Sequence, residues 1–79
     1  MAKYREEFPV GSLVQVLPRP SLEEFRETWR HHNPLQEEQL SFADATARVR
    51  EVGFYHGGDV LYHLDGLPGI WHEGCLRKA

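Results

Sequence analysis

The chain has 79 residues and a formal net charge of −3 at pH 7, with 41% hydrophobic and 27% charged residues. This length suits one small domain over residues 1–79, and the composition is typical of a folded domain rather than a disordered one. The acidic charge argues against a basic nucleic-acid binder, and the apolar runs are too short to cross a bilayer. Cys75 is the single cysteine, so an internal disulfide is excluded and a reducing, cytoplasmic location is expected.

The first element predicted along the chain is a strand over residues 12–17. Leu13, Val14 and Val16 surround the polar Gln15, which fits a strand with one buried face. Pro18 has no N–H group for a strand ladder, so we expect the strand to end there.

A helix is predicted to begin at Ser21. Ser21 and Glu24 have the spacing of a capping box, in which each side chain accepts from the backbone N–H of the other residue. Leu22, Phe25 and Trp29 recur at positions i, i+3 and i+7, which predicts one apolar stripe.

The following segment predicts the end of that helix and the start of another. Residues 30–32 are expected in the last helical turn, where positive charge is favourable. Asn33 before Pro34 has the pattern of an N-cap for a second short helix over 34–40. The two helices form a helical insertion over about residues 21–40, inside a connection spanning 18–44.

The rest of the chain is predicted to form a meander of short strands. Ala45, Ala47 and Val49 alternate with polar residues, which indicates a strand over 45–52, and Gly53 suggests a bulge. Glycine-rich turns are expected at 56–59 and 65–69. The further strands are predicted at 60–64, 70–73 and 77–79, with a tight turn at 74–76.

Hydrophobic patterning also predicts how the strands on either side of the 65–69 turn pair. We expect Leu64 opposite Ile70 and Tyr62 opposite His72, with Val60, Tyr62, Leu64 and Ile70 sharing the core face. His63 and His72 then point to opposite faces of the sheet, because successive strand residues alternate. A register shifted by one residue would instead place His63 opposite His72 and make a metal site feasible.

Short antiparallel strands avoid exposed edges by curling toward a barrel, so the predicted fold is mostly β, a five-stranded partly open barrel with the helical insertion after its first strand. The segment Val10-Gly11-Ser12-Leu13-Val14-Gln15-Val16 resembles the entry strand of SH3-like barrels. The ending Trp71-His72-Glu73-Gly74-Cys75-Leu76 resembles their final turn and strand. The chain looks most like the accessory SH3-like barrels of the ferredoxin-thioredoxin reductase variable subunit and the nitrile hydratase β subunit. This resemblance implies a role as an accessory protein that contacts another protein.

The insertion is the main functional lead, because long connections in compact domains are usually functional or complete the core. Leu22, Phe25 and Leu40 are expected to cover the open end of the barrel. Aromatic and arginine side chains anchor protein interfaces, so we expect an exposed patch that binds a protein partner or a second copy. Its candidate residues are Trp29, Arg30, His31, His32, His63 and Trp71.

The alternative function is a small metal-binding or thiol-dependent enzyme. Imidazole is a common metal ligand, and His72, Cys75 and His63 are the candidate ligands or dyad members. The spacing of a four-ligand site is not visible, and a buried cysteine in a final turn is more often a packing residue. His56 lies in a Gly-Gly turn that an ordinary hairpin explains. A non-enzymatic interaction module without a cofactor is therefore the favoured prediction.

Overall fold

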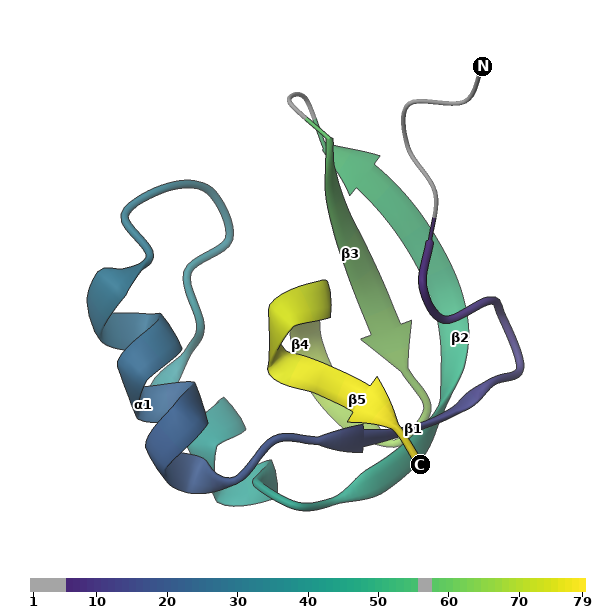
Figure 1. The fold of residues 1–79 in the computed structure, drawn as a ribbon, viewed down its shortest axis with the longest axis horizontal. Helices are drawn as coiled ribbons and strands as arrows, with labels where there is room; N and C mark the ends of the chain where they lie inside the picture. The colour runs from purple at the N-terminus through teal and green to yellow at the C-terminus, as the bar shows by residue number, and fades with distance from the viewer. Residues whose placement is uncertain (1–5, 56–57) are drawn as a thin grey trace.

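The computed structural model describes residues 6–55 and 58–79, which form five strands, an α-helix and two 3-10 helices (Figure 1). In chain order these are β1 (Leu13–Val16), α1 (Arg19–Thr28), η1 (Glu37–Phe42), β2 (Thr46–Tyr55), β3 (Asp59–Leu64), β4 (Leu67–His72), η2 (Glu73–Cys75) and β5 (Leu76–Lys78). All paired strands are antiparallel, in the order β4-β3-β2-β1-β5. The mostly β prediction is confirmed, with five strands in one sheet that is not closed.

The first two strands follow the predicted alternation. Val14 and Val16 are buried on β1, and Ala47 and Val49 are buried on β2, whereas the residues between the β2 pair are exposed. The expected bulge lies elsewhere, however. β2 carries one extra residue between Val49 and Glu51, and Gly53 pairs regularly with Leu61. β2 also extends to Tyr55, because its pairing with β3 continues to Asp59.

The predicted register between β3 and β4 is wrong. Leu64 pairs with Leu67 across the two-residue turn Asp65-Gly66, in which Gly66 has a φ of +79°. An Asp-Gly pair is a strong two-residue hairpin turn, and it prevails over the longer turn expected at 65–69. β4 then bulges before Trp71, where Gly69 has a φ of +86°.

This corrected register reverses the faces expected for β4. Trp71 pairs with Tyr62, and both side chains are fully buried in the core. His72 pairs with Leu61, on the opposite face of the sheet. His63 is two residues from Leu61, so His63 and His72 share a face rather than lying on opposite faces.

The helix α1 begins earlier and ends earlier than predicted. Pro18 is its N-cap residue, and no side chain caps this end, so the capping box expected between Ser21 and Glu24 does not form. Pro20 does not prevent this early start, because the first-turn N–H groups need no helical partner. The helix ends at Thr28, so residues 30–32 lie in a loop instead of its last turn.

The second helix is also shifted along the chain. Asn33 has a φ of 48° and is not an N-cap. The cap residue is Gln36, whose backbone N–H donates to Oε1 of Gln39, and η1 follows over Glu37–Phe42. Gln39 is 1% exposed, and its Nε2 donates to the carbonyl of Ile70 on the edge strand β4. One buried amide therefore caps η1 and ties it to the sheet.

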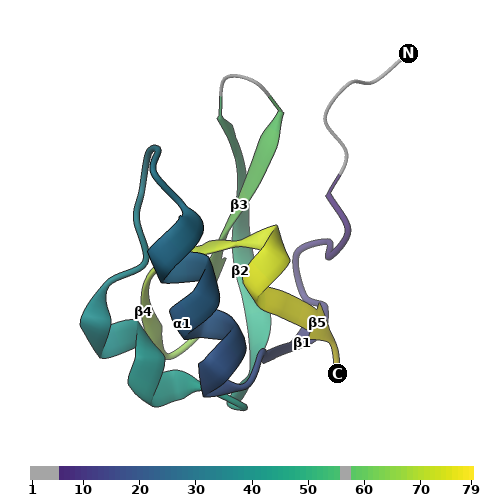
Figure 2. The same cartoon turned by 60° about the vertical axis from the view of Figure 1, so that its left-hand side comes forward.

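The helical connection covers one side of the sheet, and α1 lies beside η1 and η2 (Figures 1 and 2). Leu22, Leu35 and Leu40 are buried in the same core as the strand residues, and Phe25 packs against it half-buried. The expected contribution of the insertion to the core is thus confirmed. Among the described residues, no helix has the length and apolar character required to span a membrane.

Candidate functional site

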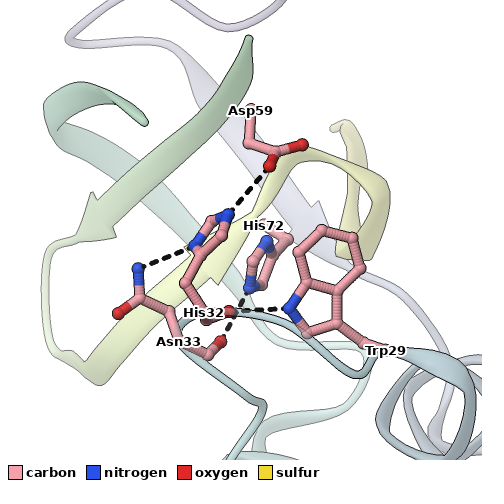
Figure 3. A network of polar contacts seen from close by, with 5 residues as sticks. All are labelled: Trp29, His32, Asn33, Asp59 and His72. Carbon is pink, nitrogen blue, oxygen red and sulfur yellow. Dashed lines mark hydrogen bonds and ion pairs between the residues drawn. The ribbon is translucent and has the colours of Figure 1, made fainter. Parts of the chain in front are cut away.

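The loop that follows α1 folds back on itself through Trp29. The indole Nε1 of Trp29 donates to the carbonyl oxygen of His32 at 2.6 Å (Figure 3). The Trp29 ring stacks on Phe25 at a centroid distance of 5.3 Å, and the ring of His31 meets its edge at 5.1 Å. Trp29 is half-buried and His31 is exposed. The loop is therefore held in shape by its own aromatic residue.

His32 connects this loop to the hairpin of β2 and β3. Its Nε2 lies 2.8 Å from Oδ2 of Asp59 at the start of β3. The side-chain amide nitrogen of Asn33 lies 3.2 Å from Nδ1 (Figure 3). The ring also stacks on Tyr55 at a centroid distance of 3.6 Å and an interplanar angle of 17°. Both ring nitrogens of His32 are thus engaged in positioning the loop.

His72 lies beneath the loop at the end of β4. It is only 4% exposed, and its Nε2 donates to the carbonyl oxygen of Asn33 at 2.7 Å. Its ring lies 4.9 Å from Phe25 and 4.8 Å from Trp29 between centroids. Burial lowers the pKa of His72, because the charged imidazolium loses its hydration. His72 is therefore neutral at pH 7.

Two segments distant in sequence, the loop after α1 and the β2–β3 hairpin, thus meet in one surface, which we call the aromatic face. It consists of Trp29, His31, His32 and Tyr55, with Asp59 at its edge. The side chain of Asp59 is 41% exposed, and that of His32 is 14% exposed. Tyr55 is also exposed, at 42%. A hollow lined by His31, His32, Tyr55 and Asp59 lies over it. Such fixed rings with a carboxylate beside them suit contact with a ligand.

The structure brings together four of the six residues predicted for the interaction patch. Trp29, Arg30, His31 and His32 lie in one loop, and Arg30 is exposed. The expected exposure of Trp71 is wrong. Trp71 is 0% exposed, because the bulge in β4 turns its side chain into the core.

His63 is half-buried on β3 and stands apart from the other members of the predicted patch. Its register partner is Glu51 on β2. Among the described side chains, no ring contact or hydrogen bond joins His63 to the loop residues.

The residues expected for a metal site or a thiol enzyme are not gathered in one place. Cys75 is buried in the core, whereas His63 and His72 lie on the other face of the sheet. Burial raises the pKa of Cys75 to about 12, which keeps the thiol protonated. Within residues 6–55 and 58–79, no three histidine, cysteine, aspartate or glutamate side chains are placed to hold a metal ion. His56 lies outside the described residues.

Sequence reasoning missed Tyr55, Asp59 and Asn33 as site residues. The sequence predicts a turn at Asp59, which follows two glycines, and a capping role for Asn33. Their function in the site depends on the contact between the loop after α1 and the β2–β3 hairpin, which no short sequence pattern encodes.

The chain was also compared with known proteins, and no family model, curated protein or solved structure matches it.

Proposed function

We propose that this chain is a small non-enzymatic protein-interaction or accessory module with an SH3-like, partly open barrel. The order of its strands supports this proposal. A long connection separates β1 from β2, three strands then follow as hairpins, and a single 3-10 turn precedes the last strand. A cytoplasmic location follows the expectation from its single cysteine.

The observation that carries the proposal is the aromatic face. The loop after α1 and the β2–β3 hairpin meet there. Hydrogen bonds hold the rings of Trp29 and His32, and the ring of Tyr55 stacks on His32. Aromatic and arginine side chains are enriched where proteins contact each other, and they dominate the binding energy of such interfaces. The exposed Arg30 and His31 belong to the same loop. The partner is a second copy of the chain or another protein.

The test compares two triple variants that keep Trp29, because Trp29 holds the loop. The first variant, Arg30→Ser/His31→Ser/Tyr55→Ser, is the aromatic-face variant. It removes two exposed side chains of the aromatic face and the exposed arginine of the same loop. The matched control, Val10→Ser/Leu13→Ser/Lys78→Ser, removes two exposed apolar residues at and before the start of β1 and one exposed cation on β5. Val10 and Leu13 are 63% and 41% exposed. Circular dichroism checks that both variants remain folded.

Association is measured by sedimentation velocity for the chain alone. A second measurement uses titration with the purified protein that the wild-type chain retains from extracts of its source cells. We expect the aromatic-face variant to weaken association at least tenfold, and the control to bind as the wild type does. Equal binding by the wild type and the aromatic-face variant would refute the proposal.

A further inference from the structure

A second hollow lies beside the aromatic face, between α1 and η2. Its volume is about 270 Å³. Phe25 and Trp29 form aromatic walls, and the buried His72 forms its floor. Asp59 and Glu73 contribute carboxylates, and Gly74 leaves room because it has no side chain. The volume is below the roughly 300–1,000 Å³ of typical small-molecule pockets, so it suits a single side chain.

The charge of this hollow is negative. Asp59 uses Oδ2 to bind His32, and Glu73 uses Oε2 to accept from Tyr62 and from the backbone N–H of Glu7. In the described part of the chain, no hydrogen bond uses Oδ1 of Asp59 or Oε1 of Glu73. Among the residues that the structure describes, no arginine or lysine lines the hollow, and the chain as a whole carries a net charge of −3. The complementary ligand is therefore a cation.

The shape and chemistry favour a guanidinium over an ammonium group. A cation is attracted to the face of an aromatic ring, and tryptophan is the strongest such partner. Guanidinium is planar, is more weakly hydrated than ammonium and has donors on several edges, so it stacks on a ring while donating to two carboxylates. Trp29, Asp59 and Glu73 offer this combination in one hollow.

We propose that this hollow receives an arginine side chain of the partner, with its guanidinium against Trp29 and hydrogen-bonded to Asp59 and Glu73. The inference rests on the proposed interaction function and names the chemistry of the partner at this point. The partner segment that reaches the end of the sheet near η2 is therefore basic.

Two-dimensional amide NMR of the full chain tests this inference with three blocked pentapeptides. They have the sequence Gly-Ser-Xaa-Ser-Gly, where Xaa is arginine, lysine or citrulline, the uncharged analogue of arginine. We expect the arginine peptide to shift the indole N–H signal of Trp29 and the amide signal of Gly74 in a saturable way. The citrulline and lysine peptides should bind at least fivefold more weakly.

Three variants complete the test. Asp59→Asn should weaken the arginine peptide about tenfold or more, because the amide lacks the charge. Asp65→Asn, in the exposed β3–β4 turn, is the matched control and should leave binding unchanged. Gly74→Leu should block binding by filling the hollow, since a Cβ at Gly74 meets no atom within 4 Å. The NMR spectra also report whether each variant is folded.

The outcomes separate this inference from the proposed function. Equal binding of the arginine and citrulline peptides, equal binding of the lysine peptide, or undiminished binding by the folded Asp59→Asn variant would each overturn the arginine assignment. If the aromatic-face variant still loses association in that case, the interaction proposal stands without the arginine site. If the aromatic-face variant also associates normally, both fail.

Discussion

Gly69 offers a sharp test of how the fold positions the site, because the bulge at this residue determines which face of β4 carries His72. Gly69 has a φ of +86°, and a Cβ added there would lie 2.9 Å from Nε2 and 3.0 Å from Cδ of Gln39. On a surface, the end of a glutamine would move away at little cost. Gln39 is 1% exposed, and its side-chain amide is hydrogen-bonded to the backbone of Gln36 and Ile70. Any movement of this amide breaks those hydrogen bonds.

The expected cost of Gly69→Ala has two parts. A non-glycine residue with positive φ costs about 1–2 kcal/mol. Leaving buried polar groups without their partners costs about 1–3 kcal/mol more. The free energy of unfolding should therefore fall by about 2–5 kcal/mol. Gly66→Ala is the matched control, because Gly66 also has a positive φ, of +79°, and a Cβ added there meets no described atom within 4 Å. Gly66→Ala should lower the free energy of unfolding only by the cost of the positive φ, about 1–2 kcal/mol.

Urea unfolding followed by far-ultraviolet circular dichroism measures both variants. A double variant, Gln39→Ala/Gly69→Ala, isolates the contact, because the clash is absent in the Gln39→Ala background. In that background Gly69→Ala should cost no more than Gly66→Ala does in the wild type. The reasoning fails if Gly69→Ala and Gly66→Ala destabilise the wild-type chain equally.

Three other predictions concern single groups. Burial lowers the pKa of His72, so the unfolded chain takes up a proton there that the folded chain resists. Stability is complete above the unfolded pKa of about 6.5 and should fall as the pH drops below it, by at most about 1.4 kcal/mol per pH unit. His72→Gln keeps a donor for Asn33 and should reduce this slope in urea unfolding at several pH values; an unchanged slope would contradict the assignment. The thiol of Cys75 should react with Ellman's reagent only when urea unfolds the chain, since it is 1% exposed and burial raises its pKa to about 12. Rapid labelling of the native chain would show an accessible, activated thiol. Tyr62→Phe removes a hydrogen bond to the carboxylate of Glu73 and should lower the free energy of unfolding by about 1.5–3 kcal/mol, and a loss below about 0.5 kcal/mol would mean that this bond adds no net stability.

The elements that follow a regular hydrophobic period could be predicted from the amino-acid pattern alone. Val14 and Val16 on β1, and Ala47 and Val49 on β2, face the core as their spacing predicts. Leu22 likewise faces the core as the helical stripe predicts. These residues follow simple periods, because a strand or a helix with one buried face needs apolar side chains at regular intervals.

The element boundaries and the register of β4 could not be predicted from hydrophobic alternation. Asp65-Gly66 closes a shorter turn than the one expected, and the bulge at Gly69 then moves Trp71 into the core and His72 to the other face. The helix ends at Thr28, where the backbone of Trp29 turns extended and its indole Nε1 donates to the carbonyl oxygen of His32. The contacts of Trp71 and His72 depend on packing between distant segments, whereas the Asp65-Gly66 turn is a local hairpin signal.

Only part of the candidate site could be predicted from the sequence, because its residues come from distant segments. The run 29–32 marked the loop, because aromatic and basic residues are adjacent in the chain. Asp59, Tyr55 and His72 join it through a hydrogen bond and ring contacts across 27, 23 and 40 residues of sequence. A short sequence pattern indicates which side chains a segment carries. Only the folded chain determines which of them meet, because that depends on how the loop after α1 packs against the end of the sheet.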